Sequence, residues 1–192
     1  KSMEEQLFLY DVTKKKDKKN EVLSCSDSDK VIKKSIEYWQ IFVDGAARGN
    51  PGPAGAGAHI FNLNQDMKGA FFLGDKTNNQ AEYLALILAL CLLMSKIDKN
   101  DLKNSLLTIH SDSELLIKQL CGFYKIKNPI LVKLNNLVVR LLKDIPHKFV
   151  HVLRDKNKVA DKLANEGIDK KKKIPTNFLN FLADFNEIGV II

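Results

Sequence analysis

The chain has 192 residues, which suits one domain, or one domain with a tail. Hydrophobic residues make up 45% of it and charged residues 28%, proportions that are ordinary for a globular protein. The net charge of +7 permits an anionic partner such as a nucleic acid but does not require one. Ten glycines and five prolines exclude a collagen-like or proline-rich chain.

The cysteines and apolar runs narrow the choice of compartment. Cys25, Cys91 and Cys121 are too few and too scattered for a disulfide framework or a zinc knuckle. The longest apolar run, Tyr83 to Met94, falls short of the ~18 to 20 residues that cross a bilayer, and it lies mid-chain, unlike a signal peptide. We therefore expect reduced thiols, a cytoplasmic location and no membrane partner.

Residues 1–37 differ in composition from the rest of the chain. They contain the lysine run Lys14 to Lys19 and the Ser/Asp-rich stretch Ser24 to Asp29, with few apolar residues and no sustained period. This pattern predicts a basic, charged and flexible N-terminal extension. The first residue is Lys1 rather than Met, which leaves open that the chain is a fragment of a larger protein or a processed product.

Three strands are predicted after this extension. Tyr38 to Val43 is rich in β-branched and aromatic residues, His59 to Phe61 forms a second strand, and Lys68 to Leu73 a third. The glycine- and proline-dense stretch between the first two, Gly45 to Gly57, is expected to be a turn. Short connections between the three strands indicate an antiparallel meander.

Helices and two further strands follow. Asn78 or Asn79 is expected to cap a helix that runs to about Lys96 and is apolar nearly all round, so that it is buried. The next elements are a central strand at Leu106–His110, a short helix at Glu114–Leu120 and a longer helix from Pro129 onward. After them come a fifth strand at Lys148–Leu153, a helix at Asn157–Ile168 and a short terminal helix around Phe178–Phe185. The order β-β-β-α-β-α-α-β-α predicts a mixed sheet covered by helices, in an α/β or α+β domain.

Four acidic residues stand where stability alone disfavours them. Asp44 follows the apolar first strand, Glu82 lies early in the buried helix, Asp112 ends the fourth strand, and Asp161 lies early in the helix from Asn157. A carboxylate near a core costs several kcal/mol unless it is paired or metal-bound. Each acid alone also has a plain alternative, as a turn cap or as a favourable charge at a helix N-terminus.

The combination of the four acids indicates a metal site. The first and fourth strands are both candidates for central positions, so their carboxyl ends can lie side by side, and the two helices pack against the same sheet. Four converging carboxylates would repel one another, and divalent cations would relieve that repulsion. Hard oxygen ligands favour Mg²⁺ or Mn²⁺. Two such ions, ~3.5 to 4 Å apart, clamp a phosphodiester and activate a water.

Four segments of the chain resemble ribonuclease H type 1. They occur in the family's order and at its spacing, over roughly residues 38–169, and they are Val43–Gly55, Thr77–Tyr83, His110–Ser113 and Arg154–Ala164. The resemblance implies the ribonuclease H-like fold, a five-stranded mixed sheet with helices on both faces. It places the domain at residues 38–169 and leaves residues 170–192 as a C-terminal tail with a short helix.

The resemblance also implies an activity. It predicts an endonuclease that hydrolyses the RNA strand of RNA–DNA hybrids and leaves 5′-phosphate and 3′-hydroxyl ends. The family's four metal ligands correspond to Asp44, Glu82, Asp112 and Asp161, with two Mg²⁺ ions as cofactors and Mn²⁺ as a substitute. One ion would activate the attacking water and the other would stabilise the leaving oxygen. The expected partner is a hybrid duplex, bound by a monomer.

Substrate contacts follow from the same resemblance. Asn50, Asn78 and the backbone around Gly45 correspond to family positions that read 2′-hydroxyl groups. Thr77 corresponds to a position that grips a phosphate of the DNA strand, and Asn79 is also expected to contact that strand. The alternative for Thr77 and Asn79 is an ordinary helix cap.

The chain departs from the family pattern in two places. Arg154, at the start of the loop before the last acid, is the expected auxiliary catalytic residue in place of a mobile histidine, with phosphate positioning or a plain surface charge as alternatives. A short connection, Gly122 to Pro129, replaces a long basic protrusion, and its Lys125 and Lys127 could touch phosphates. Two other functions stay open: a non-catalytic module that binds hybrids or double-stranded RNA, and the ribonuclease H domain of a larger reverse-transcriptase-type polyprotein.

Overall fold

The computed structural model describes residues 36–185. The predicted N-terminal extension therefore lies almost wholly outside the described residues. Within them the chain forms one five-stranded sheet in the order β3-β2-β1-β4-β5. The strands are β1 (Glu37–Ala47), β2 (Gly52–Phe61), β3 (Asp66–Lys76), β4 (Ser105–Ser111) and β5 (His147–His151).

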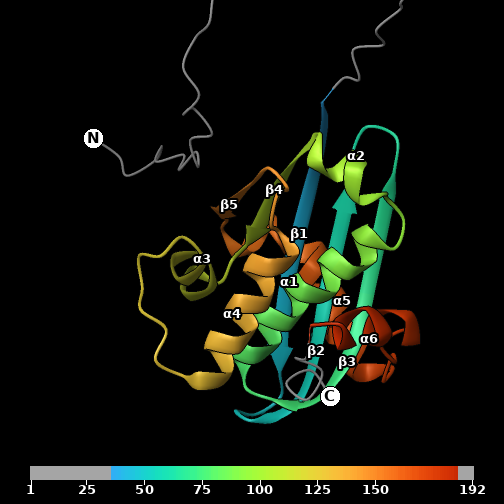
Figure 1. The fold of residues 1–192 in the computed structure, drawn as a ribbon. Helices are drawn as coiled ribbons and strands as arrows, with labels where there is room; N and C mark the ends of the chain where they lie inside the picture. Colours follow the sequence, from blue (N-terminus) through green and yellow to red (C-terminus); the bar gives the residue numbers. More distant parts are fainter. Residues whose placement is uncertain (1–35, 186–192) are drawn as a thin grey trace, which may run out of the picture.

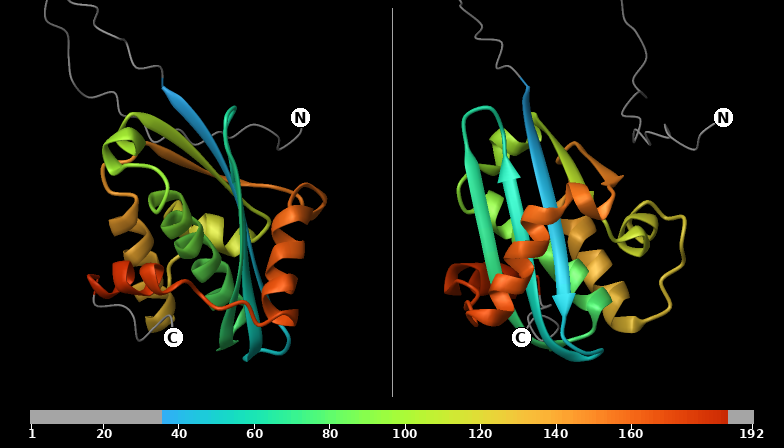
Figure 2. Two further views of the ribbon diagram at one scale, coloured as in Figure 1. Left: turned by 90° about the vertical axis from the view of Figure 1, so that its right-hand side faces the viewer. Right: turned by 180° about the vertical axis from the view of Figure 1, so that it is seen from behind.

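Helices cover both faces of this sheet, which confirms the predicted fold class. One face carries α5, and the other carries α1, α4 and α6 (Figure 1; Figure 2, left). The bounds are α1 (Asn78–Met94), α2 (Lys99–Lys103), α3 (Glu114–Leu120), α4 (Pro129–Leu141), α5 (Lys158–Asp169) and α6 (Thr176–Ala183), with a 3₁₀ turn η1 (Arg154–Lys156) before α5.

The sheet is mixed, and its centre is parallel. β1 pairs antiparallel with β2 and parallel with β4, while β4 in turn pairs parallel with β5. Phe42 of β1 lies opposite His110 of β4. Because parallel neighbours end at the same edge, the residues that follow these two positions emerge together at the carboxyl ends of β1 and β4.

The stretch predicted as a glycine-rich turn, Gly45 to Gly57, is mostly strand, and the prediction was wrong there. β1 continues to Ala47 and β2 already begins at Gly52. The glycines serve packing, because α5 lies directly over β2. A Cβ added at Gly57 would lie 2.1 Å from the carbonyl oxygen of Ala160 in α5. Glycine inside a strand marks such a close backbone approach.

Helix α1 is buried along almost its whole length, as its sequence predicted. It packs on β1, β2 and β3 on one side and on α4 on the other. Its cap is Thr77, however, rather than Asn78 or Asn79. The Thr77 side chain accepts a bond from the backbone N–H of Gln80, and the Gln80 side chain accepts one from the N–H of Thr77. This reciprocal capping box satisfies two N–H groups that a helix start otherwise leaves unpaired.

The remaining predicted elements agree with the sequence in type, and some differ from it at their ends. α3 and α4 begin at the predicted residues, and α6 begins two residues before the expected Phe178. The five-residue helix α2 was not predicted, because one helical turn carries no measurable period. Among residues 36–185 no helix combines the length and the apolar character needed to span a bilayer.

Candidate active site

Four acidic residues from four different elements meet at the carboxyl ends of β1 and β4. Asp44 lies in β1, Glu82 on α1, Asp112 directly after β4, and Asp161 in the first turn of α5. Asp44 and Glu82 are each only 6% exposed, while Asp112 and Asp161 are half-buried. Since Phe42 and His110 are paired, Asp44 and Asp112 each lie two residues beyond a matched pair of the parallel ladder.

The electrostatics of the group reflect this convergence. Burial, and then the negative charges of Asp112 and Asp161, raise the pKa of Asp44 to about 7, and a hydrogen bond with the Asp112 side chain adds to the rise. Burial, followed by the charges of Asp44 and Asp112, also raises the pKa of Glu82 well above its ordinary value. Two of the four groups therefore favour the neutral form unless positive charge is supplied.

Gly45 allows α1 to approach β1 closely enough for Glu82 to join the group. A Cβ at position 45 would lie 2.2 Å from the backbone nitrogen of Glu82, so that only glycine fits. The N–H of Gly45 donates to Oε2 of Glu82 at 3.2 Å. The resemblance assigns the backbone around Gly45 to 2′-hydroxyl contacts, which stays a prediction, and in this structure the N–H of Gly45 also holds Glu82.

Asn157, the residue before α5, was quoted only as part of a motif and was missed as a functional candidate. Its Nδ2 donates to the backbone carbonyl of Val43 at 2.9 Å and to Oδ1 of Asp112 at 2.7 Å. The residue is 1% exposed. No periodicity or spacing indicates such an inward turn, because an asparagine before a helix ordinarily reads as a cap.

Two basic or ionisable side chains border the acids. Nη2 of Arg154 lies 3.4 Å from Oδ1 of Asp161, and its positive charge opposes the rise in the pKa of Asp44 and Glu82. The Arg154 side chain is 83% exposed, which leaves it room to meet a ligand. Nε2 of His151, the last residue of β5, lies 3.2 Å from the backbone carbonyl oxygen of Asp112.

The residues predicted to contact substrate gather at the start of α1. Oδ1 of Asn50 accepts a bond from the N–H of Asn78 at 3.2 Å, which ties the β1–β2 turn to α1. Thr77 caps the helix, and the exposed Asn79 lies in its first turn. The turn and the helix start lie at the same end of the molecule (Figure 1). Thr77 therefore acts as a helix cap, which is one of the two alternatives predicted for it.

The four acids fit divalent metal ions in their chemistry. The donors are all carboxylate oxygens, the type that Mg²⁺ prefers, and the raised pKa values mark a surplus of negative charge. Among residues 36–185 no group of three or more His, Cys, Asp or Glu side chains is arranged so that it could hold a metal ion as it stands. Mg²⁺ keeps several waters and takes only one or two protein carboxylates alongside substrate phosphates, so it does not require three protein ligands.

Comparison with known proteins agrees with this fold. Residues 42–167 match the model of the family described as reverse transcriptase-like. A solved structure of LC11-RNase H1, isolated from compost by a metagenomic approach, is 40% identical with a TM-score of 0.63, over 70% of this chain and 97% of that one. A second structure of LC11-RNase H1, in complex with an RNA/DNA hybrid, is 37% identical with a TM-score of 0.61, over 69% and 98%.

Two curated relatives match over shorter segments. Ribonuclease HI of Halobacterium salinarum is 38% identical over 90 residues, which are 46% of this chain and 42% of the relative. A bifunctional protein of Mycobacterium tuberculosis is 37% identical over 97 residues, 49% of this chain and 25% of the relative. The matched part thus spans less than half of each of these two relatives. The chain belongs to the reverse transcriptase-like family and, within it, to the ribonuclease H type 1 proteins.

Proposed function

We propose that this chain is an endonuclease that hydrolyses the RNA strand of RNA–DNA hybrids, uses two Mg²⁺ ions and leaves 5′-phosphate and 3′-hydroxyl ends. The observation that carries the proposal is the meeting of Asp44, Glu82, Asp112 and Asp161 from four elements, with the pKa of two of them raised. A relative named Ribonuclease HI and a neighbour solved with an RNA/DNA hybrid support it.

In this proposal the four carboxylates hold the metal ions. When bound, Mg²⁺, or Mn²⁺ in its place, would supply Lewis-acid chemistry that favours an attacking hydroxide and stabilises charge on the leaving oxygen. The residues of the chain keep the carboxylates in place: the N–H of Gly45 fixes Glu82, and the 6% exposure of Asp44 limits its movement. Arg154, exposed beside Asp161, is the auxiliary cation that would meet the scissile phosphate.

The proposed hybrid contacts lie around the start of α1. Asn50 and Asn78, held together by their hydrogen bond, and the backbone at Gly45 would read the 2′-hydroxyls that distinguish RNA from DNA. Thr77 and Asn79 would contact a phosphate of the DNA strand, where the N–H groups of a helix start attract anions. Oγ1 of Thr77 accepts from Gln80 but keeps its own O–H proton, which remains able to donate to a phosphate oxygen.

The deciding experiment compares matched RNA–DNA, RNA–RNA and DNA–DNA duplexes, each with Mg²⁺, with Mn²⁺ and with EDTA. We expect cleavage of the hybrid alone, with loss of cleavage in EDTA and new RNA ends that carry 5′-phosphate. Asp112→Asn should lower the rate by at least 10²-fold while circular dichroism shows an unchanged fold. The exposed Asp155→Asn is the matched control and should keep the wild-type rate.

Two outcomes would favour the alternatives that the sequence left open. Tight hybrid binding without cleavage, across both metals, would point to a non-catalytic binding module instead. Activity that appears only after a further polypeptide is added would point to a domain of a larger reverse-transcriptase-type polyprotein. A monomeric state and a cytoplasmic location stay predictions from the sequence.

A further inference from the structure

Asn157 occupies a helix-cap position without acting as a cap. It directly precedes α5, where an asparagine side chain ordinarily accepts a bond from the helix N–H groups. Here the side chain makes no such bond, and the backbone angles, φ −106° and ψ 12°, are not the extended ones that a capping residue adopts. The side chain instead turns into the molecule, where it is 1% exposed.

The amide of Asn157 is oriented by its two partners. The carbonyl oxygen of Val43 and Oδ1 of Asp112 both accept hydrogen bonds from Nδ2 of Asn157, so Oδ1 of Asn157 points away from them. Within residues 36–185, that buried Oδ1 has no hydrogen-bond partner. The helix has thus lost a cap and the core has gained an unsatisfied oxygen, and both lower stability. The same arrangement holds the Asp112 carboxylate in a fixed position.

We infer that Asn157 is a positioning residue that holds the Asp112 carboxylate in place for metal binding. Its two bonds reach the backbone of β1 next to Asp44 and the acid at the end of β4, and its own main chain leads into α5, which carries Asp161. One neutral side chain thereby links three of the four acid-bearing elements. A lysine or arginine there would bond to Asp112 but would neutralise the charge that a cation needs. The inference rests on the proposed metal-dependent function.

Two substitutions test this role through metal affinity. Asn157→Asp keeps the shape and places a carboxylate oxygen against two acceptors, whereas Asn157→Ala removes the bridge. Titration calorimetry with Mg²⁺ alone should give a dissociation constant about 10- to 100-fold weaker than wild type for both, the range typical of residues that orient metal ligands. In cleavage assays at fixed Mg²⁺, kcat should fall while KM for the hybrid changes little.

A matched control separates positioning from general destabilisation. Asn128 caps α4, and its Oδ1 accepts bonds from the N–H groups of Ile130 and Leu131. Asn128→Ala should lower the melting temperature without changing the affinity for Mg²⁺. If Asn157→Asp and Asn157→Ala fold and bind Mg²⁺ as tightly as wild type, the inference is wrong, while the proposed function survives.

A measurement on the metal-free protein keeps the two proposals distinguishable. In wild type both side-chain amide protons of Asn157 are hydrogen-bonded, so their NMR signals should exchange slowly with solvent. Asp112→Ala should speed the exchange of one proton and spare the one bonded to Val43. Unchanged exchange of both would refute the Asn157–Asp112 link even if wild type bound no Mg²⁺, a result that by itself would count against the proposed function.

Discussion

At the scale of single residues, the raised pKa of Asp44 makes the stability of the fold depend on pH. Its pKa of about 7 in the folded protein compares with 3.8 for an unperturbed aspartate. Between these two values the folded state retains a proton that the unfolded chain has released. The contribution of Asp44 to stability is therefore present below pH 4 and is lost as the pH rises toward 7. Asp44 therefore lowers the free energy of unfolding of the metal-free protein most strongly at neutral pH.

We predict that Asp44→Asn stabilises the metal-free protein, and more so at higher pH. The gain over wild type should grow between pH 4.5 and 7.5 to a few kcal/mol, since one pKa unit corresponds to about 1.4 kcal/mol. Urea denaturation in EDTA at several pH values measures it. Asp75→Asn, at an exposed site, is the control and should leave the free energy of unfolding close to that of wild type. A pH-independent gain for Asp44→Asn would contradict the electrostatic origin.

The sequence predicted that the four acids would come together, and the electrostatic coupling among them agrees with this, whereas it gave no prediction for the side chain of Asn157. Each acid was conspicuous because it followed or interrupted an apolar run, and it was the combination of the four, not any one position alone, that indicated a metal site. Asn157 gave no comparable signal, because its role depends on a side chain that turns inward to meet Val43 and Asp112. The hydrogen bond from the N–H of Gly45 to Glu82 was not predicted either, because the approach of α1 depends on tertiary packing.

At the scale of elements, the contact between α5 and β2 sets the position of Asp161. We predict that Gly57→Ala destabilises the protein by about 2 to 4 kcal/mol, because its new Cβ would meet the Ala160 carbonyl and the Ala164 nitrogen of α5, neither of which can yield. Thermal denaturation measures the loss. Activity should fall further than the unfolded fraction explains, since α5 must shift with Asp161.

The matched control for this prediction is Gly74→Ala. Gly74 has a φ of +67°, but a Cβ there would meet nothing within 4 Å. Its loss should be only about 1 kcal/mol, from backbone conformation alone, with activity per folded molecule unchanged. Equal effects of the two substitutions on activity would show that the approach of α5 to β2 does not position Asp161.

The same contact explains which elements the sequence could predict. Helix α4 was placed correctly because its apolar residues recur at the helical period, and α3 because a strand-to-helix turn precedes it and Gly122 stops it. The start of β2 was missed because glycine weakens a strand in isolation. Glycine is required there only because the backbone of α5 lies so close to β2. Local propensity and tertiary packing conflicted at that position, and packing decided the outcome.

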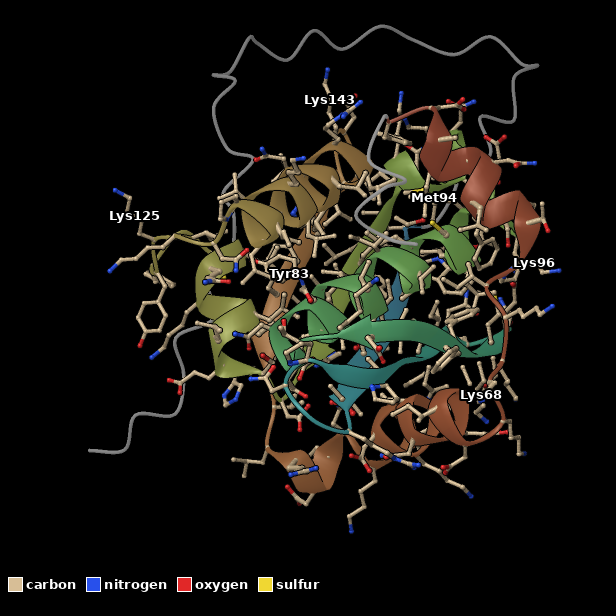
Figure 3. All side chains as sticks on the ribbon, turned by 90° about the horizontal axis from the view of Figure 1, so that it is seen from below. Lys68, Tyr83, Met94, Lys96, Lys125 and Lys143 are labelled. Carbon is tan, nitrogen blue, oxygen red and sulfur yellow. The ribbon has the colours of Figure 1, made fainter. Side chains whose placement is uncertain are left out.

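At the scale of the whole molecule, positive charge is spread over distinct sides. Figure 3 shows Lys125 projecting from the α3–α4 connection on one side, while Lys96 lies on the opposite side. Lys125 and Lys127 are both exposed on that connection, where Lys118 also stacks against the ring of Tyr124 at 4.9 Å. A charged and aromatic loop suits a nucleic-acid backbone, whereas isolated lysines elsewhere suit solvent.

We predict that the double substitution Lys125→Ala with Lys127→Ala weakens hybrid binding in a salt-dependent way. Each lysine that contacts a phosphate adds about one to the slope of log affinity against log salt, so the slope should fall by up to about two. KM measured between 50 and 200 mM salt gives this slope. The kcat should stay close to that of wild type, because neither lysine is part of the group formed by the four acids.

Lys96→Ala with Lys143→Ala removes the same charge from exposed positions outside the α3–α4 connection and is the control. If both pairs lowered the salt slope equally, the net charge of +7 would attract the duplex without orienting it. A fall confined to the Lys125 and Lys127 pair would mean that the short connection places the hybrid along one side of the molecule. In that case the positive lysines of the loop would neutralise the negative phosphates of the duplex. The acids would balance only the positive charge of their own metal ions.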